Sequence, residues 1–377
     1  MDFELDQDQQ MLAKTVADFA KNESPVERFR KLRDDDVGYD SAVWTHMGEL
    51  GWLGVPFPES VGGFGGGFVE CAIVLEKLAT TLVPEPYLAS VVLGGLTLLR
   101  AGNDAQHAAY LTPMIEGDTT LALAYSEAQS RHDVTAVGTT ATPDARGYRL
   151  SGKKVWVLNG HNADHLIVSA KAPGGVTLFV VPRDAKGLTV TVAKTIDGHK
   201  AAFVELQDVI VTEDARLGAE GSGAAVLDRT IDYAAAGAVA EAVGITTTML
   251  HMTIDYLGTR EQFGAKIGSF QALQHRAVDM YAEVELLRSI SMASMVRADD
   301  DDDARRSDVS AAKYQLATGG IWVAQQSLQL HGGIGATDEH DIGLYFKRMY
   351  ALNALFGDEE HHVARFAADP SFVEAYT

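Results

Sequence analysis

Arg260 lies in a segment whose residue types suit the binding of a negatively charged ligand. The run from Tyr256 to Ala272 places this guanidinium close to a tight turn in which Gly264 directly follows Phe263. A guanidinium binds a pyrophosphate through two parallel hydrogen bonds, which is one chemistry that the segment could perform. The other interpretation is structural, an arginine that caps a helix and forms a surface salt bridge. Taken alone, the segment fits this structural role better.

Two other clusters could suggest a metal ion, but neither has suitable spacing. The run from Asp299 to Asp303 lacks the glycine and the spaced ligands of a calcium-binding loop, so it predicts a solvated loop between helices. His361 and His362 are adjacent on a predicted helix, where neighbouring side chains point in different directions. We therefore expect a helix-surface role for this pair and no metal site in the chain.

Three regions of different hydrophobic pattern must position these residues. Residues 1–120 have apolar residues at helical spacings of three and four, and residues 121–217 contain short β-rich runs separated by turns such as Asn159-Gly160. Residues 218–377 return to long helical periods. The order predicts an α+β multi-domain protein with an N-terminal helical bundle, a middle β-barrel or sandwich and a C-terminal four-helix bundle.

The composition narrows the possible classes of function. The chain has 377 residues, 46% of them apolar, and its formal charge of −21 repels phosphate polymers, so nucleic-acid binding is disfavoured. The apolar stretch from Leu88 to Leu99 is much shorter than the ~20 residues that a bilayer requires, and the acidic start has no signal-peptide pattern. The single cysteine, Cys71, lies in a predicted buried helix and cannot form an internal disulfide. We therefore expect a cytoplasmic protein that does not insert into membranes.

Several segments together resemble the signature of the acyl-CoA dehydrogenases, flavoproteins that desaturate acyl-CoA thioesters at the α,β position. The resemblance extends along essentially the whole chain, and it includes the segment around Arg260, the Ser126-Glu127 pair and the runs 110–117, 150–160 and 329–335. It implies the acyl-CoA dehydrogenase fold, FAD as the cofactor and an acyl-CoA as the substrate. It also implies an electron-transfer flavoprotein as the electron acceptor.

The resemblance further implies two sets of FAD-binding residues. Contacts with the isoalloxazine ring are expected in the β domain, at Tyr125, Ser126, Trp156 and Leu158. For Trp156 the competing interpretation is a plain core residue. The adenosine and pyrophosphate half is expected to be held by the neighbouring subunit, through Arg260, Gln262, Phe263, Gln329, Gly332 and Gly333. Because each such site needs two chains, we expect an oligomer.

The chain departs from the family at the catalytic base, the carboxylate that removes the α-proton. In most members this base is a Glu 27 residues after the glutamine that matches Gln329, and this position holds Phe356. A second group of members has its Glu 26 residues before the signature arginine, and that position holds Ala234. Two nearby carboxylates, Asp358 and Asp232, are candidates for a relocated base.

Other departures affect the flavin and the substrate side. Leu158 replaces the threonine that touches flavin N5 in the family, and Arg131 replaces a glycine that allows close approach. His132, in the same loop, could contact the CoA phosphate or the thioester, although a surface histidine is at least as good an interpretation.

The whole pattern is most similar to the small subunits of two-gene acyl-CoA dehydrogenases, such as the pimeloyl-CoA dehydrogenase small subunit and bacterial sterol side-chain dehydrogenase β chains. In such a heterotetramer the paired acyl-CoA dehydrogenase-like chain carries the Glu. Two alternatives stay open: a self-sufficient homodimer or homotetramer that uses Asp358 or Asp232 as its base, and a flavin-free structural subunit. A flavin monooxygenase on the same fold also lacks the Glu, but it would use O₂ and a non-CoA substrate and is disfavoured.

Overall fold

The computed structural model describes residues 5–300 and 304–369, which form two compact units. The sheet unit comprises residues 32–67 and 84–234. The helical unit comprises the described residues up to 31, then 68–83, and those from 235 onward. The three sequence regions are thus distributed over two packing units, and the boundaries expected at residues 120 and 217 stay a prediction.

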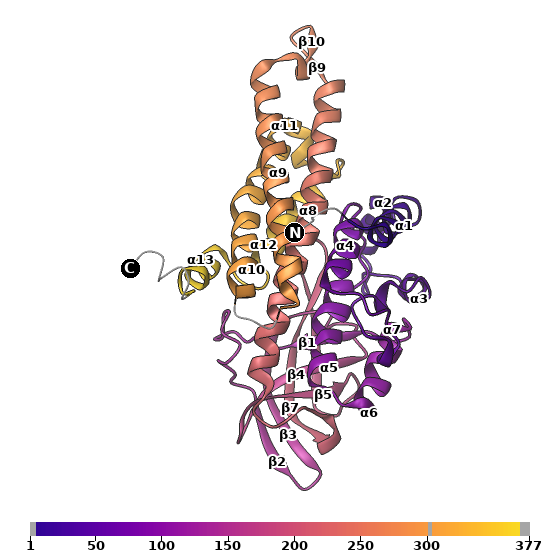
Figure 1. Ribbon diagram of the computed structural model, residues 1–377, viewed down its shortest axis with the longest axis vertical. Coiled ribbons are helices and arrows are strands. Elements are labelled where there is room, and N and C mark those ends of the chain that lie inside the picture. The colour runs from indigo at the N-terminus through magenta and orange to yellow at the C-terminus, as the bar shows by residue number, and fades with distance from the viewer. Residues whose placement is uncertain (1–4, 301–303, 370–377) are drawn as a thin grey trace. The chain divides into compact units, whose positions relative to one another are not determined.

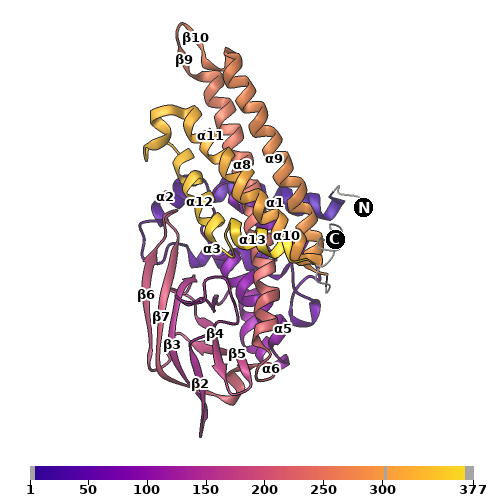
Figure 2. The same cartoon turned by 90° about the vertical axis from the view of Figure 1, so that its left-hand side faces the viewer.

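The sheet unit is built on an eight-stranded sheet. Its strands follow the order β6-β7-β3-β2-β4-β5-β8, and β1 pairs in parallel with β4. The strands are β1 (Leu121–Ala124), β2 (Thr140–Asp144), β3 (Gly147–Leu158), β4 (His165–Ala172), β5 (Gly175–Pro182), β6 (Leu188–Lys194), β7 (Lys200–Thr212) and β8 (Arg216–Leu217). Figure 2 shows β6, β7 and β3 side by side.

Short helical segments complete the sheet unit. They are α3 (Ser41–Glu49), α5 (Leu96–Ala101), α6 (Asp104–Gln106) and α7 (Thr112–Ile115), with π-helical turns at Leu88–Gly95 and His107–Leu111. Ser90 joins the first π-helical turn to the sheet, because its Oγ donates to the carbonyl oxygen of Leu121 at 2.9 Å and accepts from the Leu121 amide at 3.1 Å. This reciprocal contact fixes where β1 begins.

Burial along the strands follows from their sequences. Residues 166–170 of β4 are all buried, and all of them except Ser169 are apolar, as expected for a strand with both faces covered. In β3, buried and less buried residues alternate, but the register against β7 shifts between Leu150 and Gly152 and again between Lys154 and Val157. Such β-bulges re-aim the side chains that follow them. The second bulge therefore decides which side chains the end of β3 presents to solvent.

The helical unit contains the two longest helices, α8 and α9, together with shorter ones. They are α1 (Gln7–Glu23), α2 (Val26–Leu32), α4 (Phe68–Ala79), α8 (Gly223–Thr259), α9 (Gln271–Ala298), α10 (Ala304–Gln315), α11 (Ile321–His331), α12 (Ile342–Ala354) and α13 (Glu359–Ala367). Residues 223–234 of α8 belong to the sheet unit. Figures 1 and 2 show α8 and α9 running side by side to the hairpin of β9 (Glu261–Gln262) and β10 (Ala265–Lys266) that joins them.

Close packing and one buried ion pair hold α8 inside the helical unit. A Cβ atom added at Gly244 would lie 2.1 Å from the carbonyl oxygen of Glu76, so only glycine permits this approach of α8 to α4. Glu241 of α8 pairs with Arg348 of α12 at 2.6 Å. Within the described residues, α8 is also the one helix long and apolar enough to cross a membrane, and 89% of its most apolar window is buried inside the protein. Burial of this extent is typical of a core helix.

The structure confirms the predicted fold class of helical, β and helical regions, and Cys71 is fully buried in α4 as expected. The described part of the acidic run, residues 299 and 300, differs from the prediction of a loop that contacts only solvent. Asp299 accepts a hydrogen bond from the Phe68 amide at 2.7 Å, so it contacts the first turn of α4 instead of only solvent. Residues 301–303 of the run lie outside the described residues.

Candidate functional site

Trp156 lies at the second bulge of β3, and its backbone has a positive φ of 54°. Its side chain is 53% exposed and packs edge-on against Phe203 of β7, with ring centroids 5.1 Å apart. The plain-core interpretation of Trp156 is therefore wrong. Leu158, at the end of the same strand, is partly buried. The bulge thus presents a flat aromatic ring that a ligand can reach.

Tyr125 and Ser126 follow directly after β1 and are tied to the same bulge. The amide of Val155 donates to the carbonyl oxygen of Ser126 at 2.9 Å, which joins the end of β1 to β3. Burial raises the pKa of the Tyr125 hydroxyl above its ordinary value. The structure therefore brings three of the predicted flavin contacts, Tyr125, Ser126 and Trp156, to one region of the sheet unit.

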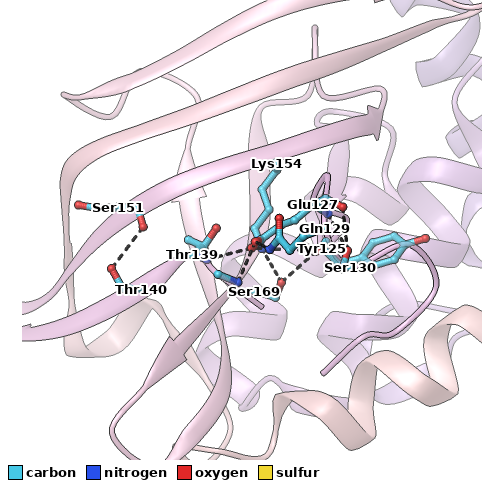
Figure 3. A network of polar contacts seen from close by, with 10 residues as sticks. Tyr125, Glu127, Gln129, Ser130, Thr139, Thr140, Ser151, Lys154 and Ser169 are labelled. Atoms are coloured by element: carbon cyan, nitrogen blue, oxygen red, sulfur yellow. Dashed lines mark hydrogen bonds and ion pairs between the residues drawn. The ribbon is translucent and has the colours of Figure 1, made fainter. Parts of the chain in front are cut away.

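A buried network of polar groups supports this region (Figure 3). The ammonium of Lys154 has no exposed surface and lies 2.6 Å from Glu127 Oε1 and 2.9 Å from Ser169 Oγ. Burial opposes ionisation of Glu127, but the hydrogen bond and charge of Lys154 outweigh it and lower the pKa of the carboxyl to about 2. Burial lowers the pKa of the Lys154 ammonium to about 8, against the opposing effect of Glu127. Both groups are therefore charged at neutral pH.

Sequence reasoning missed Lys154 as a buried residue. The signal that could have found it is the alternation along β3, in which Tyr148, Leu150 and Lys154 are buried while Lys153 is exposed. A lysine at an inward position needs a counter-charge, because an unpaired buried charge is very costly. Glu127 provides that charge.

The loop between β1 and β2 carries the candidate substrate contact His132. A turn opens this loop, since the Ser130 hydroxyl donates to the carbonyl oxygen of Glu127 and accepts from its amide, both at 2.9 Å. Arg131 follows with a positive φ of 47°. His132 is partly buried. Its contact with substrate stays a prediction.

Asn159, in the turn after β3, is a polar position that the sequence did not mark as a site residue. It is 5% exposed, and within the described residues neither its Nδ2 nor its Oδ1 has a hydrogen-bond partner. Buried polar groups are nearly always paired. The side-chain amide of Asn159 is therefore available to a bound molecule or an ordered water beside the Trp156 bulge.

In the helical unit, three predicted residues lie at the hairpin that joins α8 to α9. Arg260, Gln262 and Phe263 are exposed, and Phe263 is 95% exposed with a positive φ of 54°. Among the described residues Arg260 forms no ion pair, so the alternative interpretation of a surface salt bridge has no counter-ion there. The hairpin therefore presents a cation and an aromatic ring outward.

The Gln329 segment lies next to the Arg260 segment through an aromatic stack. His331, at the end of α11, stacks on Tyr256, one helical turn before Arg260, with ring centroids 4.6 Å apart. His331 itself is buried and its Nδ1 contacts the Ser327 carbonyl oxygen at 2.7 Å. The stack brings together the two glycine-containing segments that the sequence separates by about 70 residues.

Gly332 and Gly333 leave their backbone open to a ligand. Gly332 has a positive φ of 62°, and no described atom lies within 4 Å of a Cβ added at either glycine. Gln329, which precedes them on α11, is exposed. This open backbone is what a phosphate or ribose needs in order to approach main-chain N–H groups.

Both family positions for the catalytic carboxylate are buried and apolar. Phe356 is 6% exposed and Ala234 has no exposed surface. Asp358 acts as the N-cap of α13, where its Oδ1 accepts from the His361 amide at 2.9 Å. Asp232 is 1% exposed.

The prediction of a helix-surface role for His361 and His362 is wrong for His362. This imidazole is 1% exposed, and it contacts Ser310 Oγ and the Phe356 carbonyl oxygen, both at 3.2 Å. The reason is that α13 packs against α10, which the local sequence does not reveal. In the described part of the chain, no group of three or more His, Cys, Asp or Glu side chains is arranged to hold a metal ion.

The exposed aromatic bulge of the sheet unit and the open glycine pair of the helical unit are each compatible with a bound dinucleotide, and comparisons with known proteins identify the class of protein. Profiles of the acyl-CoA dehydrogenase N-terminal, middle and C-terminal domains match residues 6–118, 122–209 and 221–369. Acyl-CoA dehydrogenase FadE27 of Mycobacterium tuberculosis is 32% identical, over 85% of each chain.

Two solved structures are similar over nearly the whole chain. A chain of the ChsE4-ChsE5 complex from Mycobacterium tuberculosis has a TM-score of 0.90 and 29% identity and covers 100% of both chains. A variant of the Tcur3481-Tcur3483 steroid ACAD has a TM-score of 0.87 and 30% identity and covers 98% of both chains. The protein therefore belongs to the acyl-CoA dehydrogenase family. It is a flavoprotein oxidoreductase of fatty acid β-oxidation with FAD as its cofactor.

The described residues fit this cofactor. An exposed indole at Trp156 suits a planar ring system, and an arginine without a counter-ion at Arg260 suits a pyrophosphate. The open backbone at Gly332 and Gly333 allows close approach of the dinucleotide. The contact of each of these residues with FAD stays a prediction.

Proposed function

We propose that this chain takes part in the α,β-desaturation of an acyl-CoA thioester as the subunit of a heteromer whose partner chain supplies the catalytic Glu. One observation carries the proposal: Phe356 and Ala234, which hold the two family positions of the base, are both buried and apolar. Neither side chain can accept a proton. A reaction that requires removal of an α-proton therefore needs a base from elsewhere.

The residues of this chain have binding and orienting roles in the proposal. FAD, when bound, accepts the hydride that leaves the acyl β-carbon. Trp156 provides an apolar face for the ring system, and Tyr125, Ser126 and Leu158 lie near the same strand ends. In a second chain's site, Arg260, Gln262 and Phe263 contact the pyrophosphate and adenosine half together with Gln329, Gly332 and Gly333.

The alternative of a self-sufficient enzyme with a relocated base is less well supported. The Asp358 carboxylate caps α13 through the hydrogen bond that its Oδ1 accepts from the His361 amide, so a structural role already accounts for this residue. Asp232 is 1% exposed, which leaves a substrate little access to its carboxylate. Two of the similar structures, by contrast, bear names that pair two chains, ChsE4-ChsE5 and Tcur3481-Tcur3483.

The electron acceptor and the location complete the proposal. An electron-transfer flavoprotein is the acceptor that the family relationship supports. A cytoplasmic location is supported by the single cysteine, Cys71, which is buried and forms no disulfide.

An anaerobic visible spectrum tests the proposal. The chain is purified alone and titrated with a panel of acyl-CoA thioesters, and the same titration is repeated on the complex with a co-expressed chain that carries the family Glu. We expect flavin bleaching only in the complex, and its loss when the partner's Glu becomes Gln.

Bleaching of the chain alone, abolished by Asp358→Asn or Asp232→Asn, would instead establish the self-sufficient enzyme. The flavin-free structural subunit predicts a different result, a complex whose FAD content does not depend on Arg260. Measuring the FAD content of the complex with wild-type chain and with Arg260→Met separates this alternative from the proposal.

A further inference from the structure

Lys154 and Glu127 form a charged pair inside the sheet unit, and both belong to the short stretches that carry proposed flavin contacts. Glu127 directly follows Ser126, and Lys154 stands two residues before Trp156. The side chain of Lys154 has no exposed surface and that of Glu127 is 4% exposed, while Trp156 is 53% exposed. The β3 bulge thus turns the lysine inward and the indole outward.

The ammonium of Lys154 joins three strands. It contacts Glu127 Oε1 at 2.6 Å, Ser169 Oγ of β4 at 2.9 Å and the carbonyl oxygen of Tyr125, at the end of β1, at 3.4 Å (Figure 3). An ammonium has three donors, so each has an acceptor. The position of β3 at its bulge is therefore fixed against both β1 and β4.

The carboxylate of Glu127 closes the loop that carries His132. Its oxygens accept from the amides of Gly138 at 2.8 Å and Thr139 at 3.0 Å, next to the start of β2. The side-chain amide of Gln129 donates to it as well. One carboxylate thus holds both ends of the loop against the lysine.

We propose that Lys154 and Glu127 are positioning residues for FAD, because together they fix the Trp156 indole relative to the Ser126 backbone. The inference rests on the proposed roles of Trp156 and Ser126 in flavin binding. Apolar residues of the same volume usually stabilise a core at least as well as a buried ion pair does, so this pair is better explained by the geometry that it imposes.

The test compares four variants of the full chain. Lys154→Met removes the ammonium, and the double variant Lys154→Met with Glu127→Leu removes both charges. Lys153→Met is the matched control, since Lys153 is the adjacent residue of β3, its side chain is 73% exposed and it pairs with Glu205 at 3.2 Å. Trp156→Phe identifies the fluorescence that belongs to Trp156.

Two readouts are measured, the emission and iodide quenching of Trp156 in the FAD-free chain, and the Kd for FAD in the assembly that binds it. For the double variant we expect a changed Trp156 emission and a Kd raised at least about tenfold, which corresponds to about 1.4 kcal/mol. Lys153→Met should leave both readouts as in the wild type. If the single variant Lys154→Met does not fold, the double variant carries the test, because it buries no charge.

A folded double variant with wild-type Trp156 emission and wild-type FAD affinity would overturn the inference. Failure of the proposed site has a different signature. If FAD binds to the wild type without quenching Trp156, the assignment of the flavin site is wrong. Even then, the Trp156 emission of the FAD-free double variant reports whether Lys154 and Glu127 position the indole.

Discussion

The Nζ atom of Lys313 lies 2.8 Å from the carbonyl oxygen of Leu355, the residue immediately before Phe356. The same ammonium contacts the carbonyl oxygens of Leu352 at 2.8 Å and Asn353 at 3.3 Å, so it binds the C-terminal end of α12. Lys313 is 1% exposed. A single buried lysine of α10 thus determines the path of the chain into the position where most relatives carry their catalytic Glu.

Replacing Lys313 by Met should destabilise the helical unit without touching the proposed flavin contacts. Methionine fills similar volume but leaves one buried and two partly buried carbonyl groups without this donor, and an unsatisfied buried group costs about 1–3 kcal/mol. We expect the free energy of unfolding to fall by about 3 kcal/mol, measured by urea denaturation. Lys347→Met, at an exposed position of α12, is the control and should change stability by less than about 0.5 kcal/mol. Equal effects of the two substitutions would contradict the role of Lys313.

His362 gives the helical unit a pH-dependent stability. Burial, followed by the positive charge of Lys313, lowers the pKa of its imidazole from 6.5 to about 2 in the folded protein. Below pH 6.5 the unfolded chain therefore binds a proton that the folded protein does not, and this contribution to stability is lost progressively as the pH falls. Above pH 6.5 both states are neutral and the contribution is complete.

The measurement is urea unfolding of the wild type and of His362→Asn at pH 7.5, 6.5 and 5.5. The stability difference between the two proteins should shrink by up to about 1.4 kcal/mol for each pH unit below 6.5, because one proton is taken up on unfolding. A difference that stays constant from pH 7.5 to 5.5 would show that His362 is not the responsible group.

Motifs of contiguous residues led the sequence analysis to part of the candidate site, and the contacts of these residues with FAD stay predictions. Arg260, Phe263 and Gly332 were predicted because their neighbours in the chain carry the pattern, and the exposed hairpin and open backbone are compatible with a bound dinucleotide. The same holds for the fold, since the period of the apolar residues changes where helices give way to strands. Trp156 needed the structure, because only the bulge in β3 shows that its side chain faces outward.

The partners of the buried charges were what the sequence could not predict. The burial of Lys154 depends on Glu127, 27 residues earlier, and that of Lys313 depends on carbonyl groups about 40 residues later. Local pattern assigns adjacent pairs such as His361-His362 to the surface, because it contains no information about which helix packs against them. Long-range contacts decide these cases.

Asp358 should prove to be a helix cap and not a base. Asn caps a helix about as well as Asp does, so Asp358→Asn is expected to change stability by no more than about 0.5 kcal/mol, while Asp358→Ala should cost about 1 kcal/mol. Turnover of the heteromer with Asp358→Asn should stay within about twofold of the wild type, since that factor corresponds to less than 0.5 kcal/mol in the barrier. A loss of turnover by about a hundredfold or more, with stability unchanged, would identify Asp358 as the proton acceptor.

Arg260→Met should weaken FAD binding without weakening the fold. The guanidinium is exposed and, among the described residues, pairs with no carboxylate, so the helical unit loses no ion pair when it is removed. A charge-assisted contact with a phosphate contributes about 1.5–3 kcal/mol, which predicts a Kd for FAD raised about 10- to 150-fold. The matched control is Lys266→Met, which removes an exposed cation from the other strand of the same hairpin.

Flavin content after gel filtration and thermal unfolding of the FAD-free chain are measured for the wild type, Arg260→Met and Lys266→Met. Loss of flavin in Arg260→Met alone, at an unchanged melting temperature, assigns the contact to Arg260. Equal loss of flavin in both variants would mean that the hairpin attracts FAD only through its net positive charge, and it would contradict a specific contact with Arg260.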